Sequence, residues 1–160
     1  MIQNTFSIRT ASSQDVTSVL HCLHAAFGPY RHLYSPQAYA DTTLSRDTLI
    51  QRMQIQTVLV AVSEEDQVIG TVGGSVVSEG KEGHIRGMAV VPEWHGKGVA
   101  QSLLGSIEQE LRQQGCRRVT LDTTAPLKPA IRFYEKNGYT ATNKVSNFFG
   151  MPLYEYQKRL

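Results

Sequence analysis

Residues 90–101 read Val-Val-Pro-Glu-Trp-His-Gly-Lys-Gly-Val-Ala-Gln, and the rest of the chain can be organised around this stretch. It begins at the end of an apolar run, 85–91, which is typical of a buried strand. Pro92 ends that strand because proline has no backbone N–H to donate. Two glycines follow within three residues, and apolar residues then recur at helical spacing. These residues are Val99, Leu103, Leu104, Ile107 and Leu111. The stretch therefore predicts a strand, a glycine-rich turn and a helix.

The first turn of the expected helix favours an anion. Its backbone N–H groups have no partner within the helix, and they lie at the positive end of the helix dipole. Gly96 and Gly98 have no Cβ, so an anion can come close to the backbone, and the turn can hold a diphosphate. A nucleotide-binding P-loop fits less well, because Gly98 follows Lys97 where that motif has serine or threonine.

Composition sets the broad class of the protein. The 160 residues are most simply one domain, 1–160, with 41% hydrophobic and 19% charged residues. A net charge of +2 is too small to indicate binding to nucleic acid or membrane. The first residues lack the features of a signal peptide, and no run approaches the roughly 18 apolar residues of a membrane span. Cys22 and Cys116 match no metal-binding spacing, so we expect no metal, reduced thiols and a cytoplasmic protein.

Strand and helix signals follow one another along the whole chain. We expect strands at 6–10, 57–62, 68–77, 84–91, 119–121, 139–145 and 153–158, and helices that begin near 12, 45, 99 and 129. Residues 30–44 are expected to be irregular, and their tyrosines either line a substrate cleft or hold the loop to the core. This order predicts an α/β (α+β) fold, with a mixed, mostly antiparallel seven-stranded sheet flanked by about four helices.

Two blocks of the sequence resemble the GCN5-related N-acetyltransferases. The diphosphate signature of that family is Arg or Gln, two residues, Gly, one residue, and Gly or Ala; it is matched by His95-Gly96-Lys97-Gly98-Val99-Ala100, with His95 in place of Arg or Gln. Ala130-Ile131-Arg132-Phe133-Tyr134-Glu135-Lys136-Asn137-Gly138-Tyr139 is similar to the late family helix, A-x-x-F-Y-E-K-x-G-F. The two blocks stand in the family's order, and the resemblance extends over about 6–160.

The resemblance implies that the protein uses acetyl-CoA and has the family's fold. Strand 84–91 would separate from strand 118–123 at a bulge, and Met88, Ala89 and Val90 match the positions whose backbone pairs with pantetheine. Leu127 stands where many members have an asparagine, so one pantetheine contact is absent or replaced. The diphosphate would bind at the turn formed by His95, Gly96, Lys97, Gly98, Val99, Ala100 and Gln101.

The implied reaction moves the acetyl group to a primary amine by direct attack in a ternary complex. It needs a base for the amine, donors for the thioester oxygen and an acid for the thiolate. Tyr134 matches the tyrosine that commonly acts as the acid, and a packing role is its alternative. Arg86 stands where many relatives have a glutamate base, so Glu82, His84 or a water chain takes that role. His84 has the better ordinary pKa, about 6.5.

Two other interpretations remain open beside the acetyltransferase. One is a non-catalytic acyl-CoA-binding or regulatory module on the same fold, which the altered positions Arg86 and Leu127 permit. The other is an enzyme with an acyl donor larger than acetyl. The acceptor is expected to be a small-molecule amine or a peptide amine, and the resemblance permits a homodimer.

Overall fold

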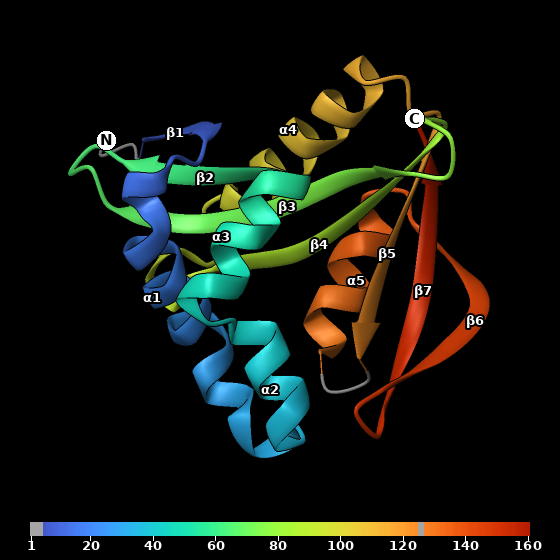
Figure 1. Ribbon diagram of the computed structural model, residues 1–160, viewed down its shortest axis with the longest axis horizontal. Helices are drawn as coiled ribbons and strands as arrows, with labels where there is room; N and C mark the ends of the chain where they lie inside the picture. The colour runs from blue at the N-terminus through green and yellow to red at the C-terminus, as the bar shows by residue number, and fades with distance from the viewer. Residues whose placement is uncertain (1–4, 125–126) are drawn as a thin grey trace.

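A twisted sheet of seven strands runs through the computed structural model, which describes residues 5–124 and 127–160 (Figure 1). The spatial order is β1-β2-β3-β4-β5-β7-β6, and only β4 and β5 are parallel neighbours. The strands are β1 (Phe6–Thr10), β2 (Thr57–Ser63), β3 (Val68–Val77), β4 (Glu82–Val90), β5 (Arg118–Thr124), β6 (Thr140–Phe148) and β7 (Met151–Arg159). The prediction of a mixed, mostly antiparallel seven-stranded sheet is confirmed.

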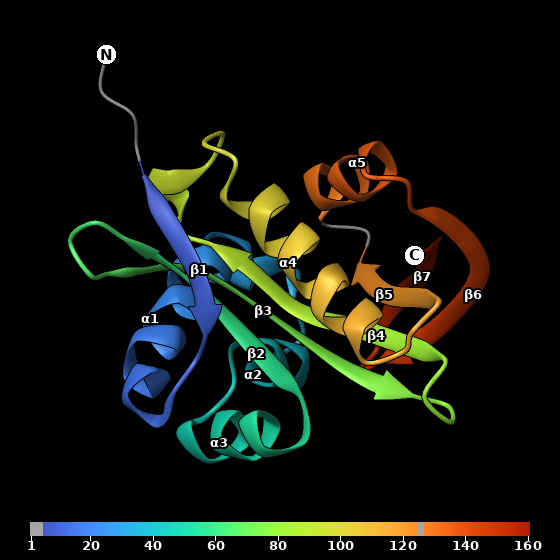
Figure 2. The same cartoon turned by 90° about the horizontal axis from the view of Figure 1, so that it is seen from above.

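Helices cover both faces of the sheet. Figure 2 shows α4 and α5 on one face and α1, α2 and α3 on the other. The helices in the described residues are α1 (Val16–Phe27), α2 (Pro36–Thr43), α3 (Arg46–Ile55), α4 (Val99–Gln113) and α5 (Lys128–Lys136). Their number in this part of the chain is five, one more than the sequence indicated. No helix among the described residues is both long and apolar enough to cross a membrane.

The additional helix corrects one expectation. Residues 30–44 are not irregular, because they hold a short 3-10 helix, Gly28–Leu33, followed by α2. Ser35 caps α2 by accepting a hydrogen bond from the backbone N–H of Ala38, and Pro36 occupies the favourable first position. Only two residues of α2 are buried, Ala38 and Thr43, so the sequence has no apolar stripe that would predict this helix.

Two buried clusters hold the layers together. Between the sheet and α4, the stripe predicted from the sequence is confirmed as buried, together with Ile85 of β4 and Tyr139. On the other face, α1 packs its buried residues against β2 and Ala89 of β4. The two cysteines are free and buried, Cys22 in the α1 cluster and Cys116 in the α4 cluster.

Candidate functional site

The sheet opens between β4 and β5. The two strands pair from Glu82 opposite Arg118 up to Ile85 opposite Leu121, and no further. Beyond this point they diverge, as Figure 1 shows, and we call this opening the β4–β5 split. The register between β3 and β4 shifts at the same place, where Gly87 has a φ of 71° that favours glycine. The expected separation of the two strands at a bulge is therefore present.

The bulge leaves backbone groups of β4 directed into the split. The N–H of Val91 donates to the carbonyl of Ile69 in β3. Because neighbouring residues of a strand point their backbone groups to opposite sides, the N–H and C=O of Val90 face away from β3, toward the split. The Val90 carbonyl already has a partner, since Nε2 of His95 lies 2.9 Å from it. The N–H of Val90 is thus the group still directed into the split, and His95 ties the turn to the strand.

The turn before α4 presents a row of backbone N–H groups. Gly98 is the N-cap of α4 with a φ of 83°, and Gly96 has a φ of 74°. A Cβ added at either glycine would meet no atom within 4 Å, so both face open space. Within the described residues, the N–H groups of 96–101 have no hydrogen-bond acceptor. Together with the helix dipole, these groups make a site suited to a diphosphate.

Lys97 lies at the rim of this turn. Its ammonium is 5.1 Å from the centre of the Trp94 ring, a cation–π contact. Trp94 in turn packs edge-on against Phe6 of β1. The exposed Lys97 therefore adds positive charge beside the predicted diphosphate site without being part of an ion pair in the described chain.

Tyr134 is buried on α5, in the same cluster as Val90 and Val99. Its ring packs edge-on against Phe133 and Tyr139. Burial raises the pKa of its hydroxyl well above the ordinary value near 10. Tyr134 is therefore a protonated phenol beside the residues predicted to contact the cofactor.

His84 and Asp122 meet where β4 and β5 separate. Nδ1 of His84 lies 2.9 Å from Oγ1 of Thr120, and Nε2 lies 3.5 Å from Oδ2 of Asp122. Burial lowers the pKa of His84, and the nearby Asp122 opposes that shift. Burial also raises the pKa of Asp122 above its usual range, while His84 opposes that shift. These shifts favour a neutral imidazole at His84 and make the carboxylate of Asp122 a stronger base than an exposed aspartate.

The two candidate bases expected from the sequence, His84 and Glu82, have different surroundings in the structure. Both ring nitrogens of His84 have partners on β5, and Asp122 is the member of the pair that lies one residue beyond the last paired residues of the two strands. Glu82 lies at the other end of β4, where Nη1 of Arg118 is 2.6 Å from its Oε1. Glu82 is thus held in an ion pair away from the split, and the arrangement favours the His84–Asp122 pair.

Segments far apart in the chain meet beside this pair. Ser35 donates a hydrogen bond of 2.8 Å to the carbonyl of Phe149, in the turn between β6 and β7. Burial raises the pKa of Tyr34, and the neighbouring Thr124 hydroxyl of β5 opposes this shift. Tyr34 also packs edge-on against Tyr39. Tyr34 therefore packs within the α1–α2 segment and borders the end of β5, whereas a role of these tyrosines in lining a substrate cleft stays a prediction.

The sequence did not predict two side chains of the candidate site, Asp122 and Arg52. Asp122 was visible only as a polar residue at the end of a strand, and its partner His84 is 38 positions earlier. Arg52 of α3, which lies beside Arg86, belongs to a helix whose pattern does not reveal its buried face. The described residues bring together no three His, Cys, Asp or Glu side chains able to hold a metal ion.

Comparison with known proteins gives relatives for both the sequence and the fold. Over 83 residues the chain is 34% identical to the probable N-acetyltransferase family 8 member 5 of Mus musculus; this match covers 49% of the chain and 37% of the relative, little more than a third of its length. The PaiA N-acetyltransferase of Thermoplasma acidophilum, in complex with coenzyme A, has the same fold, with a TM-score of 0.79, 18% identity, and coverage of 98% of this chain and 99% of that one. Ard1 of Thermoplasma volcanium gives a TM-score of 0.80 at 21% identity, with 97% of each chain covered.

The family itself is shown by a match along most of the sequence. Residues 22–139 fit the family model described as the acetyltransferase (GNAT) family. This range includes the split, the glycine turn before α4, the His84–Asp122 pair and Tyr134. The resemblance noted in the sequence is therefore confirmed, and the chain belongs to the acetyltransferase (GNAT) family.

Proposed function

We propose that the protein is an N-acetyltransferase that moves the acetyl group of acetyl-CoA to a primary amine by direct attack in a ternary complex. The observation that carries this proposal is the β4–β5 split, which has the anion-binding turn of α4 at one end and the His84–Asp122 pair where it begins. Membership of the acetyltransferase family supports acyl transfer in general, and the structural relative in complex with coenzyme A supports the donor.

The donor side of the split is the backbone of 88–101. The free N–H groups of 96–101 bind the diphosphate, and Lys97 adds a positive charge at the rim. Met88 lies in the bulge and Ala89 follows it, and their backbone with that of Val90 runs along the pantetheine arm. The N–H of Val90 is directed into the split and is suited to donate to the thioester oxygen as negative charge develops on it.

The acceptor side of the split is formed by the His84–Asp122 pair, and the amine approaches there. Asp122, held by His84, accepts the proton that the ammonium form of the acceptor must lose. The neutral amine then attacks the thioester carbon, and the carbon–sulfur bond breaks. Tyr134 gives its proton to the departing thiolate, whose conjugate acid has an ordinary pKa near 8.5. Burial raises the pKa of Tyr134, so its phenol is protonated but is a weaker acid than a free tyrosine. The Tyr134 phenolate then takes up the second proton that the attacking nitrogen loses as it becomes an amide.

A non-catalytic acyl-CoA-binding module is the second candidate. It is favoured by one observation, that Arg86 stands at the position of the usual glutamate base and forms part of an ion pair with Asp41. Such a module would bind acetyl-CoA through the same turn and release no thiol. The position of Tyr134 in the same cluster as Val90 and Val99 favours the enzyme, because it places a phenol beside the proposed donor site.

The two candidates separate in a single series of measurements. Purified protein is titrated with acetyl-CoA by calorimetry, and the same sample is then assayed for thiol release with a panel of amines. Binding together with amine-dependent release is the expected result. Binding without release from any amine would favour the non-catalytic module, and the absence of binding would show that the turn of α4 is not the donor site. Larger acyl-CoA donors in the same assay determine the size of the acyl group.

A further inference from the structure

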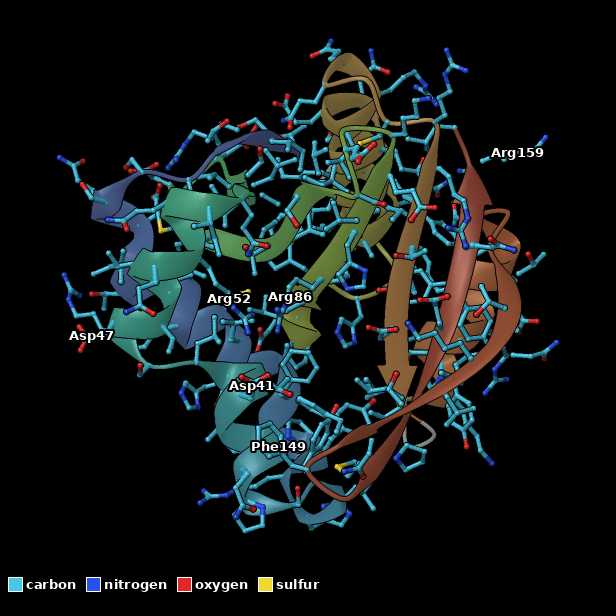
Figure 3. All side chains as sticks on the ribbon, turned by 45° about the vertical axis from the view of Figure 1, so that its right-hand side comes forward. Asp41, Asp47, Arg52, Arg86, Phe149 and Arg159 are labelled. Atoms are coloured by element: carbon cyan, nitrogen blue, oxygen red, sulfur yellow. The ribbon has the colours of Figure 1, made fainter. Side chains whose placement is uncertain are left out.

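Two arginines share one carboxylate on the acceptor side. Oδ2 of Asp41, on α2, lies 3.8 Å from Nη2 of Arg52 on α3 and 3.7 Å from Nη2 of Arg86 on β4. Figure 3 shows the three side chains gathered between α2, α3 and β4. Both contacts are to the same oxygen and both are longer than a hydrogen bond. The three side chains, Asp41, Arg52 and Arg86, together carry a net charge of +1.

Arg52 is the less satisfied of the two arginines. Its side chain is only 15% exposed, and its guanidinium makes no hydrogen bond within the described chain. Burial lowers its pKa to about 10, with repulsion from Arg86 adding to the shift and Asp41 opposing it. A guanidinium has five N–H donors, and burying it without partners is costly. A bound anion would supply these partners and relieve the repulsion between the two arginines.

The arginines stand next to the groups that handle the amine. Arg86 is two residues after His84 on β4, and the residue between them, Ile85, points into the core on the opposite face. Arg86 and His84 therefore share one face of the strand, about 7 Å apart along it. Arg86 also directly precedes Gly87 at the bulge, where the split begins. One acceptor molecule could therefore place an anionic group against Arg86 and Arg52 and its amine beside Asp122.

We propose that the acceptor is an amine that carries a carboxylate, as an amino acid does, and that Arg52 and Arg86 bind this carboxylate. This inference rests on the proposed acetyltransferase function and names the acceptor class. Guanidinium groups are planar forks that bind carboxylates through paired hydrogen bonds. Acceptors that carry several positive charges, such as polyamines and aminoglycosides, would meet like charge at the same place.

The substrate test compares each acid with the amine that lacks it. Thiol release is measured with the proteinogenic L-amino acids, each beside its decarboxylation product, such as tyramine beside tyrosine, and with spermidine. We expect kcat/KM for the preferred amino acid to exceed that for its decarboxylated partner by about 100-fold, as paired hydrogen bonds to a charged group allow. Higher kcat/KM for spermidine or for the decarboxylated amines would overturn the inference and leave the acetyltransferase function intact.

Variants assign this preference to the two arginines. Arg52→Gln and Arg86→Gln are each expected to lower the ratio of kcat/KM for the amino acid to kcat/KM for its decarboxylated partner by about tenfold or more, mainly through KM. Arg46→Gln is the matched control, since Arg46 is an exposed residue of the same helix α3 and its side chain contacts Thr17. An unchanged ratio in both Arg52→Gln and Arg86→Gln would remove these residues from acceptor binding.

Failure of the inference and failure of the proposed function give different results. If acetyl-CoA binds and no amine is acetylated, the complex of protein and CoA is titrated with the same L-amino acids by calorimetry. Binding that Arg52→Gln abolishes would support the carboxylate site while rejecting catalysis. The absence of binding would overturn both.

Discussion

The donor side of the β4–β5 split consists almost entirely of main chain from one stretch, 88–101, whereas the acceptor side consists of side chains from α2, α3, β4 and β5. On the donor side the proposed binding groups are N–H groups, so the residue types matter mainly through the backbone shapes they allow. On the acceptor side the side chains are themselves the functional groups. The donor side can therefore be retained while the acceptor side changes, because one depends on backbone shape and the other on side-chain identity.

Gly98→Asp tests the donor side most severely. A side chain at Gly98 must adopt a φ of 83°, which costs about 1–2 kcal/mol for a residue with a Cβ. The carboxylate also places negative charge beside the diphosphate, at the helix end that favours anions. We expect calorimetry to detect no acetyl-CoA binding. Gly105→Asp is the control, because Gly105 is exposed on the same helix and faces open space. Equal affinity in Gly98→Asp and wild type would move the donor site elsewhere.

Tyr134→Phe tests the chemistry between the two sides. Loss of a general acid typically lowers the rate by about 100-fold or more, so kcat should fall by about 100-fold while the Kd for acetyl-CoA stays unchanged. Tyr139→Phe is the matched control, since its hydroxyl donates to Oε2 of Glu108 at 2.7 Å and serves the core. The Tyr139→Phe variant should have a lower Tm than the wild type and an unchanged kcat. A Tyr134→Phe enzyme with normal kcat would reduce Tyr134 to a packing residue.

Asp122→Asn tests the acceptor side. We expect kcat/KM to fall by about tenfold to 100-fold, as for loss of a general base. The proposed base is the carboxylate form of Asp122 beside a neutral His84; burial raises the pKa of Asp122 and lowers that of His84. In the wild type, kcat/KM should therefore decline as pH falls and the pair takes up a proton, and this limb should change in the variant. A pH–rate profile identical to that of the wild type would exclude Asp122 as the base.

Glu82→Gln should have the smallest effect. Its carboxylate pairs with Arg118 at the closed end of the two strands, away from the split. We expect kcat/KM within about threefold of the wild type and a loss of stability of about 1 kcal/mol or less, because the ion pair is partly exposed. A 100-fold fall in kcat/KM would instead make Glu82 the base and weaken the case for Asp122.

The sequence predicted the regions whose signals are local. The stripe on α4, the glycine turn and the break at Pro92 lie within about twenty residues of one another, and each follows from a residue type and its spacing. The seven strands and their mostly antiparallel arrangement also followed from the order of the elements. The sequence did not predict α2, because a cap and a proline start that helix and it has no apolar stripe.

The sequence by itself therefore determined the fold and the glycine turn before α4, because backbone conformation depends on residues that are close in the chain. Only the tertiary structure decided the acceptor side. It joined His84 to Asp122 across two parallel strands, and it brought Asp41 and Arg52 from two helices to Arg86. It also placed Glu82 in an ion pair with Arg118. The charge and pKa of each of these groups depend on neighbours that are far away in the chain, so spacing along the sequence does not reveal them.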